Sequence, residues 1–101
     1  MLNSRNIIIS RHRGLVEWLR NHGVEGKVIE QATPDDVKDK VVYGVLPLHL
    51  ACLADRVITI DMPKLPFDKR GVDLSPEEMD NYGATMTAYA VYKLYDFDPQ
   101  V

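Results

Sequence analysis

Four polar side chains follow directly on an apolar run near the start of the chain. The stretch IIISRHRG spans residues 7–14, and its β-branched run is typical of a buried strand. Arginine guanidinium groups match phosphate oxygens in geometry, and a helix N-terminus offers unpaired N–H groups to an anion. Ser10, Arg11, Arg13 and the backbone at Gly14 are therefore candidate phosphate ligands. The alternative is that Ser10 only caps a helix and the arginines are solvated.

His12 is the first candidate for proton transfer, because histidine is the side chain that changes charge near neutral pH. The alternative is that His12 is only an exposed loop histidine. His49 is the second candidate; it either faces the same crevice or packs with its ring bonded to the backbone. No GxGxxG fingerprint and no Walker loop is present in the sequence. The three histidines lack zinc spacing, and Cys52 is expected to be a small buried side chain. No metal and no cofactor are therefore expected.

The bulk properties limit the class of protein. The chain has 101 residues, which suit one domain, and a net charge of −3 argues against binding to long nucleic acid. Residues 1–27 carry a net charge of +3, so the remainder carries −6, which suits a small anion near the N-terminal segment. No apolar run has the length of a membrane span or of a secretory h-region. With a single cysteine, a cytoplasmic protein is expected.

Hydrophobic periodicity predicts strands that alternate with helices. Strands are expected at residues 5–10, 26–30, 40–45 and 56–62. Helices are expected at residues 14–22, at 47–54 as a buried helix, and from residue 75 to about residue 94, with about one helical turn at 33–36. The last helix begins at a capping box with proline at its first position. Residues 96–101 are expected to be a short tail.

This alternation predicts a single α/β domain over residues 1–101, a Rossmann-like three-layer sandwich with a mostly parallel four-stranded sheet. Right-handed crossovers favour the strand order 2-1-3-4. Strands one and three then form a switch point, beyond whose carboxyl ends ligands bind. Residues 10–14 and 44–49 meet there, which adds Gly44, Leu46 and Pro47 to the candidate ligand contacts.

Two further groups are expected near this edge. Asp61 lies at the end of the strand expected at residues 56–62. It could bind a ribose hydroxyl or orient a histidine, and the third option is that it caps a turn. Lys69, Arg70 and Gly71 lie in a proline-containing loop, and they either close over a phosphate or form a solvated basic loop.

The same segments carry a resemblance to a known family. They are SRHRGLVEWLRNHG at 10–23, GVLPLHLA at 44–51, RGVDLSPEEM at 70–79 and YGATMTAY at 82–89. Together they resemble a small CRISPR-associated protein family that is encoded beside type III systems and related to the ring nucleases. The segments occur in the family's order and span nearly the whole chain.

The resemblance implies a fold similar to CARF (CRISPR-associated Rossmann) domains and a cyclic oligoadenylate ligand, usually cyclic tetra-adenylate. Ring nucleases cut this RNA messenger without a metal, by attack of a ribose 2′-hydroxyl on the adjacent phosphorus, and so switch off antiviral signalling. The relatives are homodimers that bind the ring across their two-fold axis.

The leading hypothesis is therefore a homodimeric, metal-independent ring nuclease. Ser10, Arg11 and Arg70 bind phosphate in it, and His12 or His49 assists proton transfer. Three alternatives stay open. One is a module that binds the ring without cutting it, and the second is a protein-interaction subunit with a tyrosine-rich last helix. The third is a general phosphate-ester enzyme of the same fold.

Overall fold

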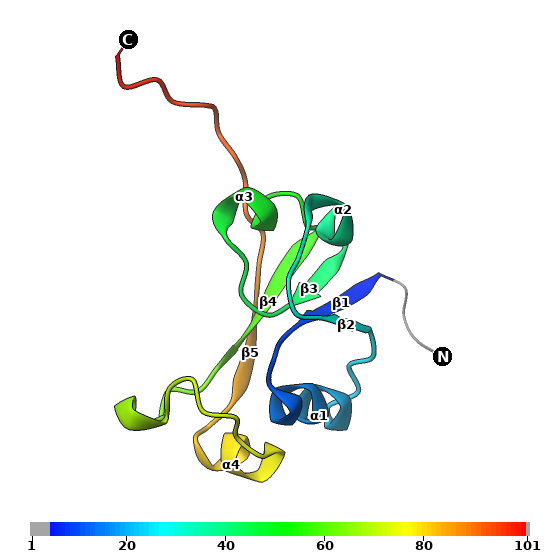
Figure 1. Cartoon of the computed structure of the whole chain (residues 1–101), viewed down its shortest axis with the longest axis vertical. Helices are drawn as coiled ribbons and strands as arrows, with labels where there is room; N and C mark the ends of the chain where they lie inside the picture. The colour runs from blue at the N-terminus through cyan, green and yellow to red at the C-terminus, as the bar shows by residue number, and fades with distance from the viewer. Residues whose placement is uncertain (1–4, 101) are drawn as a thin grey trace.

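The computed structural model describes residues 5–100, so the last residue of the tail expected at 96–101 lies outside the described part. It is an α/β structure with a five-stranded sheet in the order β2-β1-β3-β4-β5 (Figure 1). The strands are β1 Asn6–Ile9, β2 Lys27–Ile29, β3 Val41–Tyr43, β4 Arg56–Asp61 and β5 Thr85–Tyr89. The first four strands are mutually parallel, and β5 pairs antiparallel to β4.

The helices are distributed over both faces of the sheet. They are α1 Arg13–Asn21, α2 Pro34–Val37, α3 Leu48–Ala51 and α4 Pro76–Asn81, with a short 3-10 helix, η1, at Phe67–Lys69. Side chains alternate in direction along a strand, so neighbouring residues of β1 belong to two different cores. Ile8 packs with residues of α1 and α4 on one face, and Ile7 packs with residues of α2 and α3 on the other.

The covering helices are linked by buried side chains. On the first face, Trp18 of α1 is buried and its indole Nε1–H donates to the Asp80 carboxylate of α4 at 2.7 Å. Leu19 and Met79 complete the contact between these two helices and the sheet. On the second face, Val37 and Leu50 meet Val42 of the central strand. The helix pair α1–α4 therefore forms one outer layer and the pair α2–α3 the other.

The sequence predictions for β1 to β4 and α1 are confirmed to within two residues at every end. The helix expected at 47–54 is shorter, because α3 covers only Leu48–Ala51. It was also expected to be buried all round, and this is wrong: Leu50 and Ala51 are buried, but the Leu48 side chain is 76% exposed. A single helical turn lying on a sheet can bury only the side that faces the sheet.

The long last helix expected from residue 75 to about residue 94 is wrong. The helix α4 ends at Asn81, and the chain then enters the antiparallel strand β5. Gly83 has φ +75°, and the Ala84 N–H donates to the Met79 carbonyl at 3.1 Å. This is a Schellman motif, in which glycine takes the left-handed position that terminates a helix.

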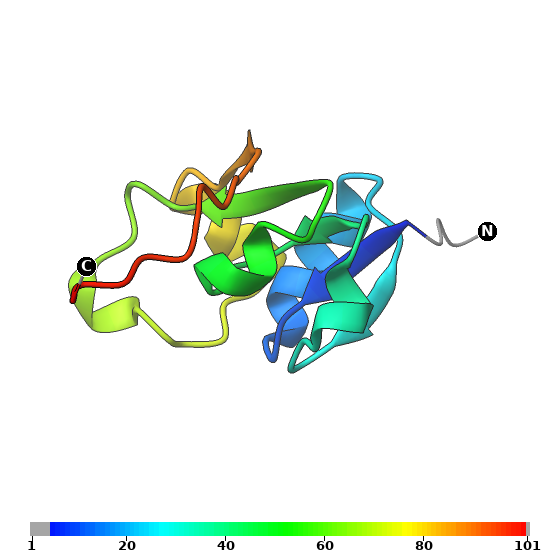
Figure 2. The same cartoon turned by 90° about the horizontal axis from the view of Figure 1, so that it is seen from above.

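The sheet therefore has five strands where four were expected, and the tyrosines expected on a helix lie elsewhere. Tyr89 ends β5, while Tyr92 and Tyr95 lie in a segment without helix or strand that begins at Ala90. This segment extends past α3 and away from the rest of the chain (Figure 1). Seen from above, β5 lies at the margin of the sheet beside β4 (Figure 2). Within residues 5–100, no helix has the length and apolar character needed to cross a membrane.

Candidate functional site

A pocket of about 330 Å³ opens at the carboxyl ends of the parallel strands. It lies where β1 and β3 end side by side, which is the switch point expected from the sequence. Its lining comes from the ends of β1, β2, β3 and β4, from α1, and from the segment that leads into α4. The lining residues are Ile9, Ser10, Arg11, His12, Leu15, Glu30, Gly44, Val45, Ile60, Met62, Val72, Leu74 and Met79.

The turn between β1 and α1 is held by its own serine. The His12 backbone N–H donates to Ser10 Oγ at 2.9 Å, and Ser10 Oγ donates to the His12 carbonyl at 3.3 Å. His12 is the N-cap residue of α1, but its side chain makes no cap hydrogen bond. Both Arg11 and His12 are exposed and line the pocket. Ser10 therefore fixes the turn, and this leaves the Arg11 and His12 side chains available at the pocket.

Gly14, a predicted ligand contact, is buried against the loop before α4. Its backbone N–H donates to Asp73 Oδ1 at 3.1 Å. A β-carbon at this position would lie 1.6 Å from the Leu74 carbonyl oxygen. The structure thus gives Gly14 a packing role, and one amide at the N-terminus of α1 already has a carboxylate partner.

Gly44 lies beside the first segment, as expected from the topology. It has φ +140°, and a β-carbon there would lie 2.6 Å from the Ile9 carbonyl oxygen. Only glycine accommodates this backbone conformation and this close approach. Gly44 and Val45 both line the pocket, whereas Leu46 packs into the core on the α2–α3 side. Pro47 is exposed at the N-cap of α3.

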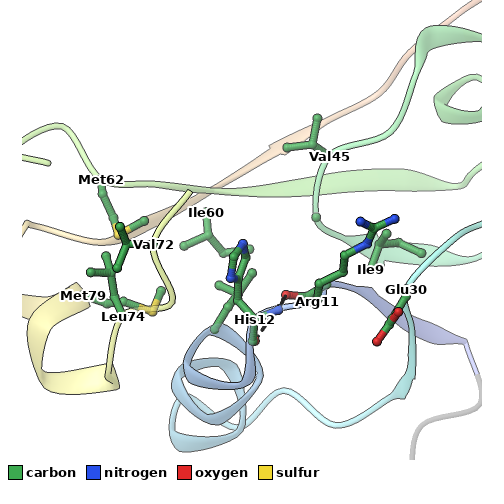
Figure 3. A pocket seen from close by; sticks show the side chains of 13 residues that line it. Ile9, Arg11, His12, Glu30, Val45, Ile60, Met62, Val72, Leu74 and Met79 are labelled. Carbon is green, nitrogen blue, oxygen red and sulfur yellow. Dashed lines mark hydrogen bonds between the residues drawn. The ribbon is translucent and has the colours of Figure 1, made fainter. Parts of the chain in front are cut away.

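The pocket has two chemically different ends (Figure 3). Arg11 and Glu30 lie at one end, together with the aliphatic side chains of Ile9 and Val45. His12 lies between this polar end and the other end. The other end is apolar, and it is lined by Leu15, Ile60, Met62, Val72, Leu74 and Met79.

Three of the other predicted residues line a neighbouring open hollow of about 620 Å³ that shares Ile60 and Met62 with the pocket. Arg70 and Gly71 line this hollow together with Asp61. The Asp61 carboxylate accepts hydrogen bonds from the hydroxyls of Thr59 at 3.3 Å and Thr87 at 3.1 Å. Asp61 thus ties β4 to β5.

Lys69 and Arg70 differ in their surroundings, although they are adjacent. The Arg70 guanidinium carbon lies 5.6 Å from the centroid of the Phe67 ring, which is cation–π geometry. Lys69 is exposed in η1 and lines neither the pocket nor the hollow. Of this basic loop, the structure therefore brings Arg70 and Gly71 near the pocket.

His49 lies apart from His12. It lines a third hollow, formed between α3 and the C-terminal segment, whose lining includes Cys52 and Tyr92. Cys52 is partly buried, and its thiol lies 3.4 Å from the His49 carbonyl oxygen. At the rim, a hydrogen bond of 2.8 Å between Lys93 and Asp96 raises the pKa of Lys93 and lowers the pKa of Asp96. The two histidines therefore do not share a site.

Sequence reasoning missed several residues of the pocket. Glu30 directly follows β2, which neighbours β1, so the strand order alone could have placed it at this edge. Val72 and Leu74 carried no local signal, because they reach the pocket only through the packing of α4 against α1. In the described part of the chain, no three His, Cys, Asp or Glu side chains are grouped so as to hold a metal ion.

The fold is that of an α/β protein with a pocket at the carboxyl edge of its parallel strands. The chain belongs to the family described as "Putative CRISPR-associated protein (Cas_VVA1548)", whose model matches residues 7–92. The CRISPR association expected from the sequence is thereby confirmed. The searches of curated proteins and of solved structures found no significant match.

Proposed function

We propose that this protein is a ring nuclease of type III CRISPR systems, which binds cyclic tetra-adenylate and cleaves it without a metal. In this proposal the fold is a Rossmann-like domain related to CARF domains. One observation carries the proposal: a guanidinium and an imidazole, those of Arg11 and His12, meet at a single pocket on the carboxyl edge of the sheet. The CRISPR family supplies the biological setting.

The polar end of the pocket suits a phosphodiester. Among residues 5–100, no hydrogen bond or ion pair engages the Arg11 guanidinium, so its donors are free for phosphate oxygens. Ser10 holds the turn on which Arg11 and His12 stand, and such preorganisation lowers the cost of binding. The Glu30 carboxylate at the same end repels an anion. Arg11 is therefore the phosphate ligand at this end.

The reaction we propose needs no added co-reactant. The 2′-oxygen of one ribose forms a bond to the adjacent phosphorus while the bond from phosphorus to the 5′-oxygen breaks. The 2′-hydroxyl loses its proton, the 5′-oxygen gains one, and the products end in a 2′,3′-cyclic phosphate and a 5′-hydroxyl. His12 is the proton carrier, and Arg11 stabilises the negative charge that develops on the non-bridging phosphate oxygens.

The size of the pocket supports a homodimer. Ligand pockets range from roughly 300 to 1,000 Å³, and about 330 Å³ suits one nucleotide better than four. A ring of four nucleotides therefore extends beyond a single protomer. A second copy of the chain would present the same pocket to the opposite side of the ring, which is the arrangement that two-fold symmetry provides.

The test is a cleavage assay with the purified chain. Cyclic tri-, tetra- and hexa-adenylate are incubated with excess protein in EDTA, and the products are separated by chromatography. We expect linear products with 2′,3′-cyclic phosphate ends from cyclic tetra-adenylate. Tight binding with an intact ring would instead identify a binding module, and cleavage of simple phosphodiesters at a similar rate would identify a general phosphodiesterase. If the ring is neither bound nor cut, the proposal fails.

A protein-interaction role is the second candidate, because large apolar side chains are exposed together near the C-terminus. Those exposed between residues 86 and 97 are Met86, Tyr89, Tyr92, Leu94, Tyr95 and Phe97. Clustered exposed apolar residues mark interaction surfaces more often than isolated ones do. Replacing Tyr92 and Tyr95 with serine tests this role: it should reduce self-association or partner capture, and it should leave ring cleavage intact if the two functions are separate.

A further inference from the structure

We infer that the apolar end of the pocket binds one nucleobase of the ligand, by packing and without side-chain hydrogen bonds. The identity of the ligand as a cyclic oligoadenylate rests on the proposed function. Base binding itself requires only that the ligand is a nucleotide.

The chemistry of the pocket changes along its length as the chemistry of a nucleotide does. Arg11 and Glu30 lie at one end, His12 lies in the middle, and the side chains of Met62, Val72, Leu74 and Met79 lie at the other end (Figure 3). A nucleotide has a charged phosphate, a hydroxylated sugar and a flat, largely apolar base in the same order. With the phosphate at Arg11, the sugar lies beside His12 and the base enters the apolar end.

The walls of the apolar end suit a flat ring. Ile60 and Met62 come from the end of β4 and the residue after it, and Leu74 and Met79 come from the segment that forms α4. A base that enters this end makes apolar contacts with side chains from both segments. Two of the four are methionines, whose sulfur atoms make favourable contacts with aromatic rings.

This end of the pocket is built before any ligand arrives. Leu74 and Met79 are buried in the core formed by α1 and α4, so their positions are set by the fold. Val72 stands at the rim with its side chain 48% exposed. Ligand pockets are usually largely pre-formed in this way.

The lining also determines which bases fit. None of the six side chains at the apolar end has a hydrogen-bond donor or acceptor suited to the edge of a base. Selection by these side chains therefore depends on size and packing. We expect purines to bind more tightly than pyrimidines, with adenine and hypoxanthine within about threefold of each other, since burial of apolar area governs both.

The experiment uses adenosine 5′-monophosphate and ribose 5-phosphate as probes, because the second carries a hydroxyl where the first carries its base. Protein labelled with ¹³C at the methionine methyl groups is titrated with each and followed by NMR. Adenosine monophosphate should bind at least about tenfold more tightly than ribose 5-phosphate, because the burial of one aromatic ring contributes enough free energy for a difference in affinity of this size. It should also shift the Met62 and Met79 methyl signals through its ring current, whereas ribose 5-phosphate should not.

A matched pair of variants localises the effect. Val72→Ser changes the rim of the apolar end, and Val28→Ser makes the same change at an exposed position of β2 that does not line the pocket. Val72→Ser should weaken the binding of adenosine monophosphate about threefold to fivefold and leave the binding of ribose 5-phosphate unchanged. Val28→Ser should change neither affinity by more than about twofold.

Equal affinity for the two probes, unshifted methionine methyls, or no binding at millimolar concentration would each overturn the inference. The outcome is separable from that of the proposed function. Ring cleavage without base-dependent binding would support the proposed nuclease activity and rule out the base site. Base-dependent binding without cleavage of cyclic tetra-adenylate would support the base site and rule out the ring nuclease.

Discussion

The Asp73 carboxylate and the Gly14 backbone N–H are hydrogen-bonded at 3.1 Å, although 59 residues separate them in the chain. This contact joins the loop before α4 to the first turn of α1. The first segment contributes Val72 and Leu74 to the apolar end of the pocket, and the second contributes His12 to its middle. Asp73 therefore fixes the position of the apolar end relative to His12, and it also places a negative charge at the positive end of the helix dipole.

Asp73→Ala should lower the free energy of unfolding by about 1–2 kcal/mol, because an N-terminal amide of α1 loses its acceptor. Asp73→Asn keeps an acceptor oxygen and should recover roughly half of this loss. Urea denaturation measures both. Asp68→Ala, in the exposed η1, is the control and should stay within about 0.5 kcal/mol of the parent. Equal stability of Asp73→Ala and the parent would show that this contact contributes nothing.

Gly14→Ala should destabilise the protein strongly, although helix propensity alone predicts a gain of about 0.5–1 kcal/mol. The added β-carbon would lie 1.6 Å from the Leu74 carbonyl oxygen, so α1 and the α4 segment must separate. We expect a fall in melting temperature on the order of 10 °C or more, from a loss of at least about 2 kcal/mol. Glu17→Ala, on the exposed side of α1, is the control. A raised melting temperature for Gly14→Ala would contradict the packing described for this helix.

His12 and Arg11 should have separable roles. His12→Ala should slow ring cleavage at least about a hundredfold and change ring affinity little, because the imidazole transfers a proton. Arg11→Ala should weaken binding about tenfold and make it less dependent on salt, because one phosphate contact is lost. Single-turnover rates and affinities at several salt concentrations measure both effects. Normal cleavage by His12→Ala would show that His12 is not the proton carrier.

Glu30→Gln should tighten binding of cyclic tetra-adenylate about threefold to fivefold at low ionic strength, because a like charge leaves the polar end of the pocket. The gain should shrink as salt is added, since screening weakens the repulsion. Glu17→Gln removes the same charge outside the pocket and is the control. Unchanged binding with lost cleavage would instead identify Glu30 as the proton acceptor.

Asp36 should contribute to the acid sensitivity of the fold. The Thr33 backbone N–H and then its hydroxyl donate to the Asp36 carboxylate at 2.9 and 2.8 Å, and they lower the pKa of Asp36 from its ordinary value of 3.8. A lowered folded-state pKa means that the stabilisation is complete above the unfolded-state value and disappears as pH falls through the folded-state value. Between pH 6 and pH 2, wild type should therefore lose more stability than Asp36→Asn, in denaturant titrations at each pH. Parallel pH profiles for the two proteins would rule this contribution out.

Local sequence patterns were sufficient for the first part of the fold. The β-branched run before Ser10 predicted β1, and Gly23 marked the end of α1. The helical turn expected at 33–36 and the capping box at Ser75 placed the starts of α2 and α4 correctly. These signals lie within a few residues of the structure that they specify. The alternation of strands with helices then placed Ser10, Arg11 and His12 at the carboxyl edge of the sheet.

The pattern after Ser75 was ambiguous, and tertiary pairing decided it. Residues Met79, Gly83, Met86 and Ala90 have helical spacing, but Thr85–Tyr89 also alternates in the manner of a strand. Gly83 terminates the helix, and β4 offers an unpaired edge to the residues that follow. The free energy of that pairing depends on β4, a strand more than 20 residues away, so no local window contains it.

The sequence by itself determined the α/β class, the start of α1 and the edge at which Ser10, Arg11 and His12 gather, because neighbouring residues encode periodicity and capping. Only the tertiary structure decided that His49 lies in a separate hollow and that Asp73 reaches Gly14. It also decided that an apolar end built from β4, α1 and α4 adjoins His12. These features depend on side chains from distant segments that meet through packing, and the packing free energy belongs to the folded chain as a whole.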